Sequence, residues 1–429
     1  MAVKIGLVGT GTVGGGCIDI IKAHAADFRR YYGIDIELVA VSSLNPEQAA
    51  AHGVSKIFTP DFMNIINNPE IDIVIELIGG TTVAHTVVTE ALKAGKHVVT
   101  ANKALMATYG VEVTELARAQ HKELAFEASV GGGIPIIDPL KHSLIANKIT
   151  QVMGIVNGTT NYMLTRMDEA GLSYDEALKE AQANGFAEAD PTADVDGFDA
   201  AAKISILASI AFNTNITLEQ VYTEGIRNLS SIDMATAKEL GYALKLLAVA
   251  NLTDEGVDVR VHPTMLPIDH QMAKVNGVFN AIWCVGDFVG ETMFFGEGAG
   301  AGAAASAVMG DVLEVARHVQ QGILPQSGNT TKDELPIIPM DDLSMKYYLH
   351  LVVHDQAGVL AKSATIFANH GVSISSMMQK GKQKGGAVDL VYITHHSSEK
   401  AIRKAVEDLK AAEGILANDS KPVVIRVVE

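Results

Sequence analysis

The sequence contains few cysteines and few aromatic residues. Cys17 and Cys284 are its two cysteines, and one tryptophan occurs among 429 residues. Two cysteines cannot build the disulfide framework of a small secreted protein, which favours a reducing compartment. The sequence also lacks the run of roughly 18 apolar residues that spans a membrane and the basic and apolar segments of a secretory signal. We therefore expect a folded cytoplasmic protein.

Positive charge is scarce as well. The chain has 33 Lys and Arg against 50 Asp and Glu, a net charge of −17. This excess of negative charge would repel nucleic acids and anionic membranes, so we expect neither as a partner. The length exceeds what one hydrophobic core accommodates, and two or three domains are expected.

Strands and helices alternate over residues 1–133. This alternation predicts a doubly wound parallel sheet of the Rossmann type, and hence the α/β class. The expected strands are Val3–Val8, Ile36–Val41, Ile71–Ile75, His97–Thr100 and Leu124–Glu127. The expected helices include Val83–Ala94 and Val111–Gln120.

Residues 134–299 follow a different pattern, which predicts an α+β domain for substrate binding and dimerisation. Its expected elements are strand Ile149–Val156, a helix from the capping box Ser173–Glu176 to Ala183, helix Phe198–Phe212, and strands near Val257–Val261 and Phe288–Phe295. The small-residue helix Ala303–Val319 is expected to return, at about residues 300–319, to complete the first domain.

Residues 320–345 are rich in proline and small polar residues, which is typical of a linker. The remainder, 346–429, has a β-α-β-β-α-β pattern that predicts a ferredoxin-like domain. Its expected elements are Tyr347–Val353, Val359–His370, Val372–Met378, Ala387–Thr394, Glu399–Ala411 and Val423–Val428.

A glycine-rich loop directly follows the first strand and opens a helix. The first glycine of such a loop makes a tight turn, the second lets the backbone approach a pyrophosphate, and the third lets helix and strand pack closely. The free N–H groups of the helix then bind phosphate. In this context the loop predicts dinucleotide binding by Gly9, Thr10, Gly11, Thr12, Val13 and Gly14.

The choice between NAD and NADP stays open. An acidic residue at the end of the second strand would bind the ribose hydroxyls and select NAD. The strand ends instead in Val41-Ser42-Ser43, with neither an acid nor an adjacent arginine. The two serines are compatible with a free hydroxyl and with a phosphate.

Lys103 follows the fourth strand in the segment Thr100-Ala-Asn-Lys103. Its position is at the carboxyl edge of the sheet, where folds of this type bind ligands. Contact with the cofactor and help in proton transfer are the functional interpretations. A solvated lysine on a loop is the alternative.

An acidic segment, 185–199, precedes a largely apolar helix, and Asp199 and Lys203 share one face of that helix at a spacing of four residues. Two explanations assign these residues no catalytic role: stabilisation of the helix dipole by the acids, and a structural ion pair between Asp199 and Lys203. A calcium loop is excluded because the acids lack its alternating spacing and terminal glutamate. A lysine in apolar surroundings, held by carboxylates that also bind a substrate ammonium, is the functional alternative.

Together these features resemble the homoserine dehydrogenase family over most of residues 1–320. The motifs are Gly9–Gly14, Thr100–Lys103, Glu127-Ala-Ser-Val-Gly-Gly-Gly-Ile-Pro135, Asn157-Gly-Thr-Thr-Asn161 and Gly185–Lys203. The resemblance implies NAD(P)-dependent interconversion of L-homoserine and L-aspartate 4-semialdehyde, a step in threonine, methionine and isoleucine biosynthesis.

The resemblance also implies roles for individual residues. Lys203 would exchange a proton with the substrate oxygen, Asp199 would orient substrate and lysine, and Glu188 would hold the substrate amino group. The implied cofactor contacts beyond the glycine loop are Lys103, Ser129, Gly185, Gly300 and Gly302. A monovalent cation, sodium in the family, would be held largely by backbone oxygens of Glu127, Val130, Gly132 and Ile134.

The C-terminal segment resembles the ACT domain of amino-acid biosynthetic enzymes, through His354–Ala361 and Asn369–Ile374. The resemblance implies an amino-acid effector bound between paired domains, with threonine as the pathway end product. The implied contacts are Asp355, Gly358, Leu360 and Asn369. A pairing module without a ligand is the alternative, and the chain is expected to form a homodimer or homotetramer.

Two other functions compete with this interpretation. The first is another amino-acid oxidoreductase on the same sheet, such as an aspartate dehydrogenase; an acyl-transfer semialdehyde dehydrogenase would need a nucleophilic cysteine, and neither cysteine has a suitable setting. The second is a non-enzymatic amino-acid sensor. The intact set Glu188, Asp199 and Lys203 disfavours it.

Overall fold

The computed structural model describes residues 2–325, 331–381, 386–417 and 420–428. Residues 326–330 of the predicted linker therefore lie outside the described residues. The chain forms two compact units, each discontinuous in sequence. The first contains Met1–Val156, Ala202–Val221 and Phe279–Leu335, and the second contains Asn157–Ala201, Tyr222–Val278 and Pro336–Glu429. The domain boundaries expected from the sequence stay predictions.

A parallel six-stranded sheet forms the centre of the first unit. Its strands lie in the order β3-β2-β1-β4-β5-β6, the order of a doubly wound sheet, which confirms the predicted class. The strands are β1 (Val3–Val8), β2 (Ile36–Ser42), β3 (Phe58–Thr59), β4 (Ile73–Glu76), β5 (His97–Thr100) and β6 (Leu124–Ala125). The predicted strand Leu124–Glu127 was too long, because the chain turns into the 3-10 helix η2 (Glu127–Ser129).

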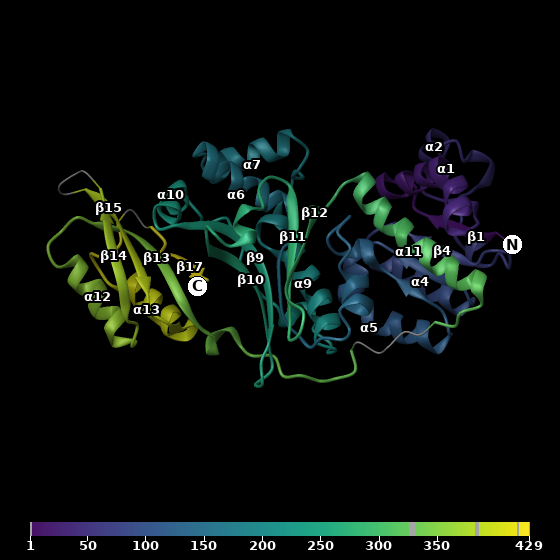
Figure 1. Ribbon diagram of the computed structural model, residues 1–429. Helices are drawn as coiled ribbons and strands as arrows, with labels where there is room; N and C mark the ends of the chain where they lie inside the picture. The colour runs from purple at the N-terminus through teal and green to yellow at the C-terminus, as the bar shows by residue number, and fades with distance from the viewer. Residues whose placement is uncertain (1, 326–330, 382–385, 418–419, 429) are drawn as a thin grey trace. The chain divides into compact units, whose positions relative to one another are not determined.

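Helices cover this sheet. They are α1 (Thr12–Tyr32), α2 (Pro46–Ala51), α3 (Met63–Ile66), α4 (Thr82–Lys93) and α5 (Lys103–Ala119). Helix α11 (Ala301–Gln321) packs into the same core as α1 and β1, although it is remote in sequence (Figure 1). Helix α5 begins earlier than the predicted Val111 because the Asn102 side chain accepts a hydrogen bond from the Leu105 N–H and caps the helix.

An antiparallel group completes the first unit. Strand β11 (Phe279–Gly286) pairs with β7 (Ile149–Ile155) on one side and with β12 (Gly290–Glu297) on the other. The predicted strand Phe288–Phe295 was therefore only part of a hairpin, in which Phe288 lies exposed at the turn. The other elements are η3 (Pro139–Ser143), the later part of α9 (Phe198–Ala211) and η4 (Leu218–Gln220).

The second unit contains helices, a long hairpin and the C-terminal module. Its first elements are α6 (Gly158–Ala170), α7 (Tyr174–Ala183), α8 (Thr192–Val195), β8 (Tyr222–Thr223), α10 (Ser231–Glu239), β9 (Tyr242–Leu252), β10 (Val257–Pro267) and η5 (Gln271–Lys274). The capping box predicted at Ser173 is present. Strand β9 was not predicted, because a short apolar run does not distinguish a strand from a buried helix.

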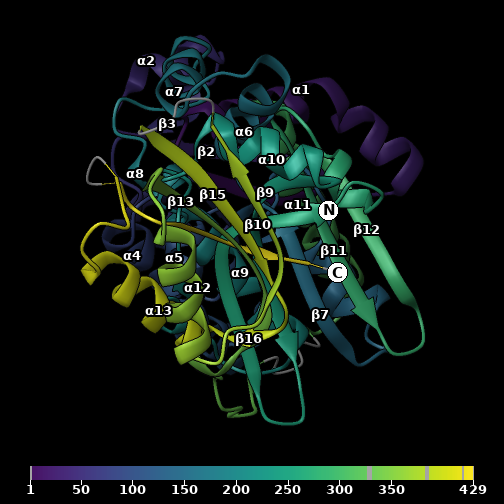
Figure 2. The same ribbon diagram turned by 90° about the vertical axis from the view of Figure 1, so that its left-hand side faces the viewer.

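The C-terminal module has the predicted ferredoxin-like order. Its elements are η6 (Met340–Asp342), β13 (Ser344–His354), α12 (Val359–Asn369), β14 (Ile374–Lys380), β15 (Ala387–Thr394), β16 (Ser397–Ser398), α13 (Glu399–Ala411) and β17 (Val423–Val427). The strands lie in the order β17-β13-β15-β14, and α12 and α13 lie side by side (Figure 2). Strand β17 also pairs in parallel with β10, through Thr264–Arg426 and Met265–Val427.

No helix among the residues that the structure describes is long and apolar enough to cross a membrane.

Candidate functional site

The glycine loop has the geometry that a pyrophosphate requires. Gly9 has a φ of 106°, and a Cβ there would lie 2.5 Å from the Leu77 backbone oxygen. A Cβ on Gly14 would lie 1.9 Å from the Gly9 oxygen, so the turn depends on both glycines. A Cβ on Gly11 would meet nothing within 4 Å, so the space in front of it is open. Gly11 is the N-cap of α1 and supplies no side-chain cap, which suits a bound phosphate.

The edge of the sheet beside this loop is built by a network that sequence reasoning missed. Glu76 is fully buried, and its carboxylate accepts hydrogen bonds from the Thr100 hydroxyl at 2.7 Å and the Ile78 N–H at 2.8 Å. The Asn102 amide donates to the Gly80 oxygen at 2.7 Å. These bonds hold the ends of β4 and β5 together and place exposed Lys103 at the first residue of α5. An acid at the end of an otherwise apolar strand was the available signal.

The end of the second strand carries neutral polar groups. The side-chain oxygen of Gln48 accepts hydrogen bonds from the Thr10 and Ser43 hydroxyls, both at 3.5 Å. Ser42 is buried. Neither of these two hydrogen bonds involves a charged side chain, so they do not distinguish the two nicotinamide cofactors.

Glu127 organises the loop that follows β6. Its carboxylate accepts N–H groups of Ile136 at 2.6 Å, Ile137 at 2.8 Å and Asp138 at 2.6 Å, and its own N–H donates to Asp311 at 2.9 Å. Burial raises the pKa of Glu127, against the lowering effect of the three N–H donors. Burial also raises the pKa of Asp311 to about 8. The Glu127 carboxylate is thus engaged by the protein, and its backbone oxygen, which accepts the Val130 N–H at 3.4 Å, is the atom expected to contact an ion.

The backbone oxygens of Val130, Gly132 and Ile134 are suited to bind a monovalent cation. Val130, Gly132 and Ile134 are buried, and no described residue donates a hydrogen bond to their backbone oxygens. Gly132 has a φ of 58°, and a Cβ there would lie 2.5 Å from the Gly298 backbone. A glycine is thus required for the close approach, and the oxygens suit a hard cation.

Three further predicted cofactor residues lie in the same unit. Ser129 is buried, and its hydroxyl donates to the Phe126 oxygen at 2.6 Å, so it is held in place. Gly300 has a φ of 117° and is the N-cap of α11, where a Cβ would meet nothing within 4 Å. Gly302 lies in the first turn of this helix, and a Cβ there would also meet nothing within 4 Å.

Lys203 is buried, at 9% exposure, in the apolar helix α9. Its Nζ donates a hydrogen bond to the Val156 backbone oxygen at 2.6 Å. The oxygen comes from the end of β7, so a strand terminus fixes the direction of the lysine. A solvated surface lysine, which is the usual setting for this residue type, is excluded.

Asp199, one turn earlier on α9, is held by Asn157. The Asn157 amide nitrogen donates to Asp199 at 2.8 Å and to Asp194 at 2.7 Å, while its oxygen accepts the Thr160 N–H and caps α6. Asp199 is 6% exposed. In the sequence Asn157 is recognisable only as a member of a motif; its bridging role follows from the folded chain.

The remaining acids of this segment have different settings. Glu188 and Gly185 lie exposed on the loop after α7, which the Thr159 hydroxyl anchors by donating to the Phe186 oxygen at 2.6 Å. Asp196 forms an ion pair with Arg227, a contact that the sequence did not predict. Glu188 is free of such an ion pair among the described residues.

The residues predicted to bind an effector separate into two places. Asp355, Gly358 and Leu360 surround the start of α12, where Gly358 is the N-cap with a φ of 93°. Asn369 is the last residue of α12. The 11 residues of this helix put the two places roughly 15 Å apart along its axis. Within one chain, therefore, the first three residues lie together and Asn369 does not.

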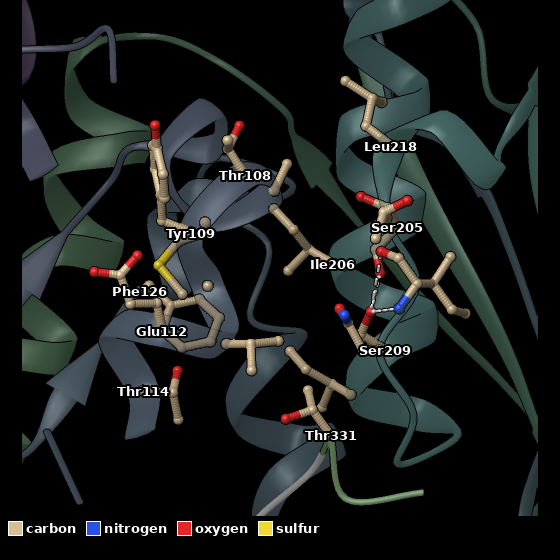
Figure 3. Close-up of a pocket in the computed structure, with 18 of the residues that line it drawn as sticks. Thr108, Tyr109, Glu112, Thr114, Phe126, Ser205, Ile206, Ser209, Leu218 and Thr331 are labelled. Atoms are coloured by element: carbon tan, nitrogen blue, oxygen red, sulfur yellow. Dashed lines mark hydrogen bonds between the residues drawn. The ribbon is translucent and has the colours of Figure 1, made fainter. Parts of the chain in front are cut away.

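A cavity of about 480 Å³ lies between α5 and the later part of α9 (Figure 3). Apolar groups such as Phe126, Ile206 and Leu218 line it together with Thr108 and Glu112. The described residues that line it include none of the predicted catalytic or cofactor residues. It is therefore separate from the predicted site.

Comparisons with known proteins decide the family. The family model "Homoserine dehydrogenase" matches residues 135–313, "Homoserine dehydrogenase, NAD binding domain" matches residues 9–127, and "ACT domain" matches residues 347–413. A homoserine dehydrogenase of Pseudomonas aeruginosa is 44% identical over 99% of this chain and 98% of its own length. The chain belongs to the homoserine dehydrogenase family.

Further relatives agree with this assignment. The homoserine dehydrogenase of Bacillus subtilis is 38% identical, over 96% of both chains. A crystal structure of a homoserine dehydrogenase from Thiobacillus denitrificans matches with a TM-score of 0.93 at 39% identity, covering 100% of this chain and 99% of that one. A hyperthermophilic archaeal homoserine dehydrogenase in complex with NADPH matches with a TM-score of 0.63 at 26% identity, over 74% of this chain and 98% of that one.

These findings confirm that the chain is an NAD(P)-dependent oxidoreductase acting on a CH–OH group, with a Rossmann-type nucleotide-binding domain and a C-terminal ACT domain. The interpretation as a non-enzymatic sensor is thereby wrong.

Proposed function

We propose that Lys203 is the proton-transferring residue in the interconversion of L-homoserine and L-aspartate 4-semialdehyde. The observation that carries this proposal is the burial of Lys203, with its Nζ 2.6 Å from the Val156 oxygen, on the helix that also carries Asp199. The Val156 oxygen fixes the direction of this buried lysine, whose ammonium group is a hydrogen-bond donor, and the substrate oxygen is the proposed acceptor of its proton.

The nicotinamide cofactor supplies the hydride when the aldehyde is reduced and accepts it when the alcohol is oxidised. During reduction, Lys203 Nζ gives a proton to the substrate oxygen as the C–H bond forms. In the reverse direction the neutral amine takes the hydroxyl proton. Asp199 orients the substrate and the lysine, and Glu188 binds the substrate ammonium.

Substitution of Lys203 by Met tests this assignment. We expect kcat to fall by about 10²- to 10⁴-fold, the usual contribution of a general acid or base, while the Kd for NADPH stays within about twofold. Nicotinamide absorbance measures the rate, and NADPH fluorescence measures binding. A Lys203→Met enzyme with the kcat of the wild type would exclude the role.

Lys245 offers a matched control. It is also buried, and its Nζ donates to the Val275 oxygen and to Asn276 at 2.9 Å, but it belongs to β9 and not to the proposed site. Lys245→Met should lower thermal stability and leave the kcat of the folded enzyme near that of the wild type.

The cofactor is proposed to bind at Gly9–Gly14, Lys103, Ser129, Gly185 and Gly300, and either NAD or NADP is compatible with Ser42 and Ser43. Titration of activity with each cofactor decides the preference.

A sodium ion is proposed to bind the backbone oxygens of Glu127, Val130, Gly132 and Ile134. Thermal unfolding in sodium against tetramethylammonium chloride tests it, and equal midpoints would contradict it.

Feedback regulation by threonine through the ACT domain is proposed on the match at residues 347–413. Threonine should inhibit the enzyme, and Asp355→Ala should weaken the inhibition without changing the uninhibited rate. The proposal would be contradicted if millimolar threonine changed neither the rate nor the melting temperature.

The chain is proposed to form a homodimer or a homotetramer, and light scattering decides between the two.

A further inference from the structure

Three side chains that commonly bind metals converge in the first unit, and none of the three belongs to the proposed function. They are Asp138, His142 and Glu314, and one ligand atom from each lies within 4.8 Å of the other two. Asp138 and His142 are in contact, with 2.5 Å between Oδ1 and Nδ1. The group contains two carboxylates and one imidazole, so it is more than a cluster of acids.

The backbone on both sides of this group is fixed. His142 lies in η3 and Asp138, four residues earlier, is the N-cap of η3; the Asp138 N–H donates to the Glu127 carboxylate at 2.6 Å. Glu314 belongs to α11, where Asp311, one turn earlier, accepts the Glu127 N–H at 2.9 Å. Glu127 thus ties the η3 turn to α11 without using any of the three side chains. The geometry exists before an ion arrives.

The carboxylate of Glu314 is without a hydrogen-bond or ion-pair partner among the described residues, although the side chain is only half-exposed. The neighbouring acid Glu123 is already engaged by His318 at 2.8 Å. Lys141 precedes His142 in η3; burial lowers its pKa, and its Nζ lies 4.2 Å from the centre of the Phe126 ring. Carboxylates therefore outnumber cations here, and a positive ion would restore the balance.

We propose that Asp138, His142 and Glu314 bind one divalent transition-metal ion of the zinc class. An imidazole with carboxylates suits zinc and its neighbours, whereas calcium and magnesium sites use oxygen ligands. The two cysteines are buried and do not belong to this group, so the proposed ligand set contains no thiolate. Binding requires the three side chains to rotate until one ligand atom of each lies about 2.0–2.2 Å from the same ion.

Such an ion would join the η3 turn to α11 and stabilise the folded first unit, because it binds the folded chain and not the unfolded one. The three protein ligands leave a fourth position for water. This role is structural and independent of the dehydrogenase reaction.

Zinc and cobalt binding to chelator-treated protein test the proposal. Equilibrium dialysis with zinc should find one equivalent more per chain in the wild type than in His142→Ala or Glu314→Gln. Cobalt should produce visible absorption bands in the wild type that both variants lose. Because His142 is exposed and Glu314 is half-exposed, both variants should keep the wild-type rate and metal-free melting temperature.

The matched control is His370→Ala. His370 also contacts a carboxylate, that of Asp408 at 2.7 Å, but the described residues place no third ligand beside this pair. This variant should keep the full metal content and the cobalt bands. The proposal is overturned if the wild type binds no more metal than His142→Ala and Glu314→Gln, or if His370→Ala loses the same equivalent.

Discussion

Asn157 holds Asp199 in place: its amide nitrogen lies 2.8 Å from an oxygen of that carboxylate and 2.7 Å from an oxygen of Asp194. The two hydrogens of one amide thus serve two negative charges. The preceding residue, Val156, accepts the hydrogen bond of Lys203 through its backbone oxygen. Two consecutive residues therefore fix both members of the proposed catalytic pair.

We expect Asn157→Asp to lower kcat by about tenfold to a hundredfold, the effect of misplacing a reacting group by about 1 Å. The new carboxylate can still cap α6 at the Thr160 N–H, but it repels Asp194 and Asp199 instead of donating to them. Steady-state kinetics and NADPH fluorescence separate a loss of turnover from a loss of cofactor binding.

The control for this variant is a substitution that removes a helix cap but does not displace the carboxylates. Ser173 caps α7, and Ser173→Ala should cost about 1 kcal/mol of stability with no change in kcat. If Asn157→Asp retains the kcat of the wild type, Asn157 acts only as a cap.

Substitution by alanine should have different effects at Gly11 and at Gly14. In Gly14→Ala the new methyl would lie 1.9 Å from the Gly9 oxygen, so the loop must open and the melting temperature must fall. In Gly11→Ala nothing protein-derived lies within 4 Å of the methyl, and the φ of −68° suits alanine. Stability should then be unchanged, while the methyl occupies the space for the pyrophosphate.

For Gly11→Ala we expect NADPH to bind at least about tenfold more weakly, a loss of about 1.4 kcal/mol. Differential scanning fluorimetry and NADPH fluorescence measure the two effects on the same samples. A Gly11→Ala protein that binds NADPH as tightly as the wild type would mean that the pyrophosphate does not lie against this glycine.

The stability of the second unit is expected to depend on pH because of the contacts of His350. Burial alone would lower the pKa of His350, but hydrogen bonds and charges of Asp233 and Asp389, at 2.8 and 2.9 Å, outweigh it and raise the pKa. Asp233, which also accepts the Tyr348 hydroxyl at 2.9 Å, has a lowered pKa despite burial. The cluster joins α10 to strands β13 and β15 of the ACT domain.

Because the folded pKa of His350 is raised, its stabilising effect is complete below the unfolded value of 6.5 and disappears as the pH rises through the folded pKa. His350→Asn should therefore destabilise the protein more at pH 6 than at pH 9, by about 1 kcal/mol. Denaturant unfolding at both pH values measures the difference. Asp233→Asn should reduce the same dependence, and a pH-independent effect of His350→Asn would contradict the assignment.

The sequence determined the order and type of most elements. Val3–Val8, Ala387–Thr394 and Glu399–Ala411 were predicted with their observed bounds, because alternation of apolar residues and caps act over a few neighbours. Its local spacing also selected Lys203 and Asp199, since residues four apart must share a helix face. The long strand β9 was missed because its apolar run has no period that distinguishes the two secondary structures.

Only the tertiary structure decided which groups hold these residues. The Asn157 bridge spans 42 positions in sequence to Asp199, and Glu314 meets His142 from a helix far along the chain. Asp196 and Glu188 look alike in the sequence, yet one forms an ion pair with Arg227 and the other is exposed. Contacts between distant segments depend on how the whole chain packs, and no local pattern of residues encodes them.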